Sequence, residues 1–271
     1  MRTFLLILSF ATALSAEPAQ YSWMPGASSE PLETRFAPPG GFRRVPAEQG
    51  SFAEWLRRLP LKRGRPEVLL YNGQPKRNQT AHAAVVDMPI SKKDLHQCAD
   101  ALMHLRAEYL FHRGNKEQIV FHSTSGDLLP FSKWQSGQRP QVQGNRIRWT
   151  QSRPADGSYQ SLSRYLEFVY TYSGTISLVS DTKKVSFGEL RIGDLFLQSG
   201  SPGHAVIVVD KAEKSGTTAF LLAQSYMPAQ ELHVLRNPQG GEWYHSDRID
   251  RELVTPEWTF ARDSLRRFPP Y

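Results

Sequence analysis

Cysteine is almost absent from this chain of 271 residues, in which Cys98 is the only one. A single thiol cannot form an intramolecular disulfide, so the sequence excludes the disulfide frameworks that hold small secreted modules together. A chain of this length can bury a full hydrophobic core without such links. We therefore expect a fold that is held by packing alone, as one large domain or two small ones.

Long apolar runs are also missing, apart from one at the N-terminus. Arg2 precedes an apolar stretch over residues 4–14, which small residues follow as far as Ala16. This arrangement predicts a cleavable secretory signal over residues 1–16, and the run is shorter than the about 20 residues that cross a bilayer. We expect the mature chain to have no transmembrane segment and to be periplasmic or secreted.

A concentrated basic tract is missing although the formal net charge is +7. The lysines and arginines are scattered along the chain, whereas a nucleic-acid-binding protein normally gathers them on one element or face. Nucleic acid is therefore not expected as a partner. A weakly basic surface instead favours anionic material of the cell envelope.

Signatures of metal and cofactor sites are missing as well. None of the eight histidines is paired with another at the spacing of a zinc motif on a helix, and no glycine-rich phosphate loop is present. We expect neither a bound metal nor a cofactor.

The patterns that are present mix helices and strands, which predicts an α+β fold. Residues 17–50 are rich in Pro, Gly, Ser and Glu and are expected to form an extended lead-in segment, followed by a single domain over residues 51–271. Residues 204–210 are almost purely apolar and β-branched, as in a central strand that is covered on both faces. Residues 126–157 form an excursion that is too long for an ordinary loop. Helices are expected over 51–59, 91–112 and 161–172, and strands over 67–71, 81–86, 195–197, 204–210, 220–226 and 232–235.

Cys98 lies within the helix expected over residues 91–112. Ser91 to Asp94 form a capping box, so the helix is expected to begin at Ser91. Cys98 would then lie two turns inside the helix, on an apolar stripe with Leu102, as a small buried hydrophobe. The polar residues around it are expected to form an ion network on the helix surface, and they are Gln97, Asp100, Arg106 and Glu108.

One constellation could carry chemistry. After the helix at 161–172, a Gly-Asp pair opens one strand, His204 opens the next, and Gln224 ends a third. Over residues 160–236 this order resembles the NlpC/P60 branch of the papain-like cysteine hydrolases, which cut peptide bonds in bacterial cell wall. The resemblance implies a papain-like core of antiparallel sheet and packed helices, with an N-terminal extension of helix and strand. It also implies that His204 is the base and that Gln224 orients its ring.

The chain departs from that pattern at the nucleophile. The position expected for a cysteine falls on Leu162, and the hydroxyl of Ser163 beside it is better explained as a helix N-cap. Cys98 could replace the missing nucleophile only if its own helix docks beside His204.

Three further runs resemble a bacterial exported family catalogued as domain of unknown function 4846. They cover residues 97–101, 200–210 and 222–230. This resemblance implies membership of a family but brings no activity with it.

Two functions from different classes remain open. The favoured one is an exported, non-catalytic NlpC/P60-like protein that binds envelope peptide or glycan. The alternative is a papain-like cysteine hydrolase of cell-wall peptides that uses Cys98 and His204. In both, the site is expected at a cleft where His204 and Gln224 lie within hydrogen-bond reach. The residues expected to contact the ligand are Ser201, Gly203 and Ser225.

Overall fold

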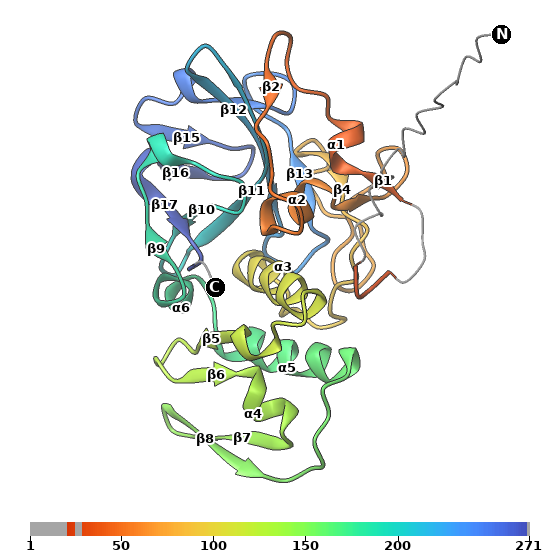
Figure 1. The fold of residues 1–271 in the computed structure, drawn as a ribbon, viewed down its shortest axis with the longest axis vertical. Helices are drawn as coiled ribbons and strands as arrows, with labels where there is room; N and C mark the ends of the chain where they lie inside the picture. Colours follow the sequence, from red (N-terminus) through yellow and green to blue (C-terminus); the bar gives the residue numbers. More distant parts are fainter. Residues whose placement is uncertain (1–20, 25–28, 270–271) are drawn as a thin grey trace, which may run out of the picture.

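The computed structural model describes residues 21–24 and 29–269, so the expected signal peptide at residues 1–16 lies outside the described part. The fold is a mixture of helices and antiparallel strands (Figure 1), which confirms the α+β class. No helix in the described ranges has the length and apolar character needed to cross a membrane. The helices are α1 (Leu32–Arg35), α2 (Phe52–Arg57), α3 (Cys98–His112), α4 (Phe131–Gln135), α5 (Tyr159–Tyr172) and α6 (Thr175–Ser180).

A central antiparallel sheet organises the larger part of the molecule. Its main path runs in the order β4-β13-β12-β11-β10-β17-β9, with β14 also paired to β12 and β2 to β11. The expected central strand is confirmed as β11, the longest strand in the sheet. The strands are β2 (Arg43–Arg44), β4 (His82–Val85), β9 (Lys183–Lys184), β10 (Leu195–Gln198), β11 (His204–Lys214), β12 (Thr217–Gln224), β13 (His233–Leu235), β14 (Tyr244–His245) and β17 (Leu265–Arg267).

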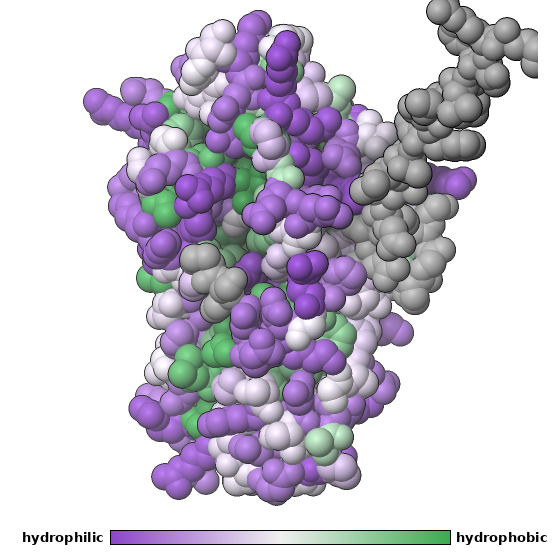
Figure 2. All heavy atoms as spheres, viewed as in Figure 1, coloured by the Kyte–Doolittle hydropathy of each residue, from purple (hydrophilic) through white to green (hydrophobic). Residues whose placement is uncertain are grey.

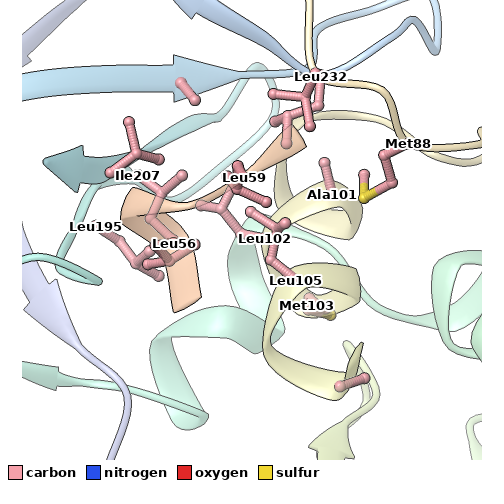
Figure 3. Packing of buried hydrophobic residues seen from close by; sticks show 14 of the residues in the cluster. Leu56, Leu59, Met88, Ala101, Leu102, Met103, Leu105, Leu195, Ile207 and Leu232 are labelled. Atoms are coloured by element: carbon pink, nitrogen blue, oxygen red, sulfur yellow. The ribbon is translucent and has the colours of Figure 1, made fainter. Parts of the chain in front are cut away.

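Side chains of β11 alternate between two apolar layers, because successive residues of a strand point to opposite faces. Ala205 and Ile207 belong to the larger core, which contains α2 and α3, whereas Val206 and Val208 belong to a smaller core on the other face. Figure 3 shows the larger core, in which Leu56 and Leu102 from the two helices approach the sheet. The strand is therefore covered on both faces, as its composition predicts.

The smaller strands form separate two-stranded sheets. β15 (Glu252–Val254) and β16 (Thr259–Ala261) pair with each other, and β16 contributes Phe260 to the smaller core. The others are β1 (Glu30–Pro31) with β3 (Pro60–Leu61), β5 (Val120–His122) with β6 (Leu128–Pro130), and β7 (Gln138–Gln143) with β8 (Arg146–Gln151).

The long polar excursion at residues 126–157 is folded. It contains β6, α4 and the hairpin β7–β8, which lie with α5 at the opposite end of the molecule from β12 (Figure 1). Trp134 of α4 packs against Tyr165 and Phe168 of α5, with ring centroids 5.9 and 6.2 Å apart. The excursion is thus a small lobe whose aromatic core joins it to α5.

The described part of the lead-in segment lies against the domain. Tyr21 donates a hydrogen bond to the Trp55 carbonyl at 2.8 Å. Arg44 in β2 and Arg57 in α2 both bind the fully buried carboxylate of Asp210, each at 2.7 Å. Tyr21 thus holds the segment to α2, and Arg44 holds it to β11. On the face that Figure 2 shows, hydrophilic residues predominate.

Two of the predicted elements are wrong. The strand expected at 67–71 is reduced to isolated bridges at Leu69 and Leu70, and the helix expected from Ser91 begins seven residues later, at Cys98.

Candidate functional site

Cys98 is the first residue of α3, because the helix is capped at Gln97 and not at Ser91. The carboxylate of Asp94 accepts hydrogen bonds from the backbone N–H of Ala229 at 2.6 Å and from the Gln97 side chain at 3.1 Å. Asp94 therefore ties its segment to the chain after β12, and the helix does not start at Ser91. Gln97 is the N-cap instead, and its backbone N–H donates to the Asp100 carboxylate at 3.0 Å.

The thiol of Cys98 is buried, as predicted, with 4% of the residue exposed. Burial raises the pKa of this thiol to about 11, and the nearby Asp100 carboxylate raises it further, while backbone N–H groups, including that of Ala205, act in the opposite direction. The contact with Ala205 is informative because this residue directly follows His204. The sulfur thus lies at the start of β11, which the prediction of a thiol two turns inside a helix did not foresee.

The expected ion network on the surface of α3 is wrong. Asp100, Arg106 and Glu108 are buried, and only Gln97 stays partly exposed. The sheet, α2 and α5 surround α3. The stripe of the helix that carries polar residues in the sequence therefore contacts protein as well. Glu108 accepts a hydrogen bond from Tyr159 of α5 at 2.7 Å.

His204 and Gln224 are hydrogen-bonded, which confirms that they lie within reach of each other on one face of the sheet. His204 Nε2 and Gln224 Oε1 are 2.8 Å apart, at the first residue of β11 and the last of β12. Since an amide oxygen only accepts, Nε2 carries the ring proton and Nδ1 keeps a lone pair. Nδ1 is buried and has no hydrogen-bond partner in the described part of the chain.

The ring of His204 is enclosed by aromatic side chains. The ring centroids of Tyr226, Trp258 and Phe260 lie 4.7, 5.2 and 5.7 Å from it. Burial is the main reason that the pKa of His204 falls to about 4, and the positive charge of Lys76 also lowers it. The imidazole is therefore neutral at pH 7.

A cleft of about 310 Å³ opens beside this pair. Its walls come from the start of α3, the start of α6 and the loop at residues 200–203, as predicted for that loop. Ser201 and Gly203 line it, and a Cβ on Gly203 would collide with Thr175 Oγ1 and the Gly200 carbonyl. The full lining is Asp94, Leu95, Gln97, Cys98, Ala99, Asp100, Thr124, Tyr170, Ser173, Gly174, Thr175, Ile176, Gly200, Ser201, Pro202, Gly203 and Met227.

The other expected site residues lie outside this cleft. His204 and Gln224 are fully buried, so they lie beneath the surface rather than at it. Ser225 is also fully buried, with its hydroxyl 2.8 Å from the Gln230 carbonyl and 3.1 Å from that of His96. These contacts give Ser225 a role in holding the segment before α3 against the end of β12.

Leu162, at the position where the NlpC/P60 pattern has its nucleophile, packs as an ordinary buried helix residue. Leu162 is completely buried in α5. Ser163 is exposed and donates to the Tyr159 carbonyl at 3.2 Å, whereas the N-cap of α5 is Ser158. The expectation that Ser163 caps the helix is thus wrong, because α5 already begins at Tyr159.

Several polar residues lie at the site although the sequence did not assign them to it. Tyr170 and Asp100 line the cleft, and burial raises the pKa of Asp100 to about 8. Lys76 and Glu257 lie behind Gln224. Within the described ranges, no group of His, Cys, Asp and Glu side chains is arranged to hold a metal ion.

Comparison with known proteins identifies a family and no activity. Neither the curated proteins nor the solved structures contain a match to this chain, so no homologue supports the resemblance to NlpC/P60 proteins. A family model described as domain of unknown function (4846) matches residues 32–267, which include Cys98, His204 and Gln224. The chain therefore belongs to the family of domain of unknown function 4846.

Proposed function

We propose that the protein is an exported cysteine hydrolase of cell-envelope peptides, with a papain-like arrangement of Cys98, His204 and Gln224. The observation that carries the proposal is the position of Cys98 at the start of α3, with its sulfur against the amide that follows His204. The sequence favoured a non-catalytic protein because Leu162 occupies the expected nucleophile position and because Cys98 was expected inside a helix. The position of Cys98 at the start of α3 removes the second of these reasons.

The resting site favours proton transfer to a neutral base. At pH 7 the thiol, with its pKa of about 11, and the imidazole, with its pKa of about 4, are both neutral. A neutral thiol is activated when an adjacent base removes its proton during attack. His204 offers Nδ1 for this purpose, because Gln224 holds the proton on Nε2.

The proposed reaction proceeds through a thioester. The Cys98 sulfur attacks the peptide carbonyl carbon while its proton moves to Nδ1 of His204, and the imidazolium then protonates the departing amine as the C–N bond breaks. Water attacks the thioester with His204 as base, releasing the acid and restoring the thiol. The first N–H groups of a helix have no partner within it, so those at Cys98 and Ala99 are suited to stabilise the oxyanion.

The choice of substrate rests on the sequence and on the cleft. The expected export signal and weakly basic charge favour envelope material. The cleft volume of about 310 Å³ suits a few residues of a peptide.

One observation favours binding without cleavage. His204 Nδ1 has no hydrogen-bond partner in the described structure, the Cys98 thiol included. If substrate does not bring the two groups together, the cleft would bind envelope peptide or glycan and leave it intact.

Turnover of muropeptides, followed by mass spectrometry, separates the two functions. We expect wild-type protein to cleave, and Cys98→Ala and His204→Ala to lose a factor of about 10⁴ or more in rate. Ser163→Ala is the matched control, because it removes an exposed hydroxyl outside the cleft, and it should cleave normally. Equal cleavage by Cys98→Ala would overturn the proposal, and binding without cleavage by wild type would favour the second function.

A further inference from the structure

A buried ion pair lies behind Gln224, on the side away from His204. The Gln224 side chain donates through Nε2 to Glu257 Oε2 at 2.8 Å. Glu257 is paired in turn with the ammonium of Lys76, and the two side chains are only 12% and 6% exposed. Lys76 precedes β4 and Glu257 lies between β15 and β16, so three distant segments meet at one amide.

Two hydrogen-bond acceptors, from Glu257 and His233, lie next to the amide nitrogen of Gln224. A carboxylate has no proton to give, so Glu257 admits only the NH₂ end of Gln224. His233 Nδ1 donates to the Glu231 carbonyl at 2.8 Å, which leaves His233 Nε2 as an acceptor. This nitrogen lies 3.4 Å from Gln224 Nε2 and 3.5 Å from Lys76 Nζ. The two amide protons thus face two acceptors.

The orientation of this amide decides the tautomer of His204. With the NH₂ group turned to Glu257, Oε1 faces His204 Nε2 and requires a proton there. If the amide turned over, NH₂ would face His204 and the ring proton would move to Nδ1. The ring would then have no lone pair at the nitrogen that must receive the thiol proton.

The hairpin that carries Glu257 also covers the His204 ring. Its turn is closed by a hydrogen bond from the Thr255 N–H to the Trp258 carbonyl at 2.8 Å, and Trp258 Nε1 donates to Gln198 at 3.1 Å. Trp258 and Phe260 from this hairpin pack against the imidazole. One element therefore holds both the amide and the ring.

We propose that Glu257 is a positioning residue that fixes His204 in its Nε2–H tautomer through the Gln224 amide. This rests on the proposed function for its consequence in catalysis. Glu257 itself touches neither the cleft nor the thiol, and Lys76 keeps its charge balanced in a buried place.

Nitrogen NMR of the full mature chain labelled with ¹⁵N-histidine tests the proposal without any substrate. The His204 signals are assigned from their loss in His204→Gln. We expect wild type to carry the proton on Nε2 alone. In Glu257→Gln the new side chain offers both a donor and an acceptor to the Gln224 amide, so the amide can adopt either orientation. We therefore expect a fraction of the molecules to carry the His204 proton on Nδ1. We also expect kcat to fall by up to about 10²-fold, with KM little changed.

Two variants control this comparison. Glu257→Asp keeps a carboxylate and should restore the Nε2–H form and part of the rate. Glu252→Gln removes an exposed carboxylate from the same hairpin and should change neither measurement.

The outcomes distinguish this proposal from the proposed function. A tautomer change in Glu257→Gln, with no turnover by wild type, would support the positioning role and refute the proposed hydrolase activity. An unchanged Nε2–H signal in Glu257→Gln would overturn the positioning role whatever the activity. If that variant does not fold, Gln224→Met removes the acceptor at nearly constant volume, and retention of the Nε2–H form there would overturn it equally.

Discussion

Alkylation of Cys98 by iodoacetamide reads the state of the proposed nucleophile directly, because the chain has no other thiol. With the pKa raised to about 11, about one molecule in 10⁴ is a thiolate at pH 7, against about 3% for an ordinary thiol with a pKa near 8.5. The thiolate population therefore falls by about 300-fold, and burial of the sulfur slows the reagent further. We expect native protein at pH 7 to react at least about 100-fold more slowly than protein unfolded in denaturant.

The pH profile of the same reaction tests the reasoning. The rate should rise steadily with pH up to about 10, and His204→Ala should follow nearly the same curve, because a neutral imidazole does not stabilise a resting thiolate. A plateau between about pH 5 and 8 that His204→Ala abolishes would instead reveal a thiolate–imidazolium pair. Labelling of native protein as fast as in denaturant would refute the burial of Cys98.

Three further predictions concern stability. Leu162→Ala should lower the free energy of unfolding by about 2–5 kcal/mol in a urea titration and leave turnover per folded molecule unchanged; a selective loss of turnover would return Leu162 to the site. Asp210→Ala should cost about 3–5 kcal/mol in the same assay, because it leaves the buried Arg57 without its carboxylate; a loss below about 1 kcal/mol would show that this pair is not needed. Since burial lowers the pKa of His204 to about 4, the stability contributed by its neutral ring is complete above about pH 6.5 and is lost as the pH falls towards 4, by up to about 3 kcal/mol. His204→Asn should therefore lose less stability than wild type over that window, and identical losses would contradict the burial of a neutral ring.

The sequence predicted the parts of the site that depend on local pattern. A β-branched run preceded by small residues located β11 and placed His204 at its start. The same reasoning located β12, whereas the pairing of His204 with Gln224 came from the resemblance to the NlpC/P60 pattern. These elements follow from alternation and turn residues, which act over a few positions.

The sequence misplaced the start of α3 because two caps compete there. Ser91 to Asp94 satisfies the local rule, yet Asp94 is used by the Ala229 N–H, which lies 135 positions away. No local rule anticipates that contact. Because the predicted helix started seven residues too early, Cys98 was expected in the helix interior and not at its start.

The polar residues behind the site were missed for a related reason. Asp100 and Glu108 fall on one stripe of α3, which reads as a solvated face, although a helix enclosed on all sides buries polar residues too. Lys76 and Glu257 come from segments with no motif, and only the fold brings them to Gln224.

Trapping of an acyl-enzyme tests the central claim most directly. Wild-type protein is mixed with a peptide substrate, quenched in acid within milliseconds to seconds, digested and analysed by mass spectrometry. The account predicts an added acyl group on the peptide that contains Cys98, released by hydroxylamine as expected of a thioester, and absent from Cys98→Ala. Turnover with no adduct on Cys98, or with an adduct on another residue, would contradict it.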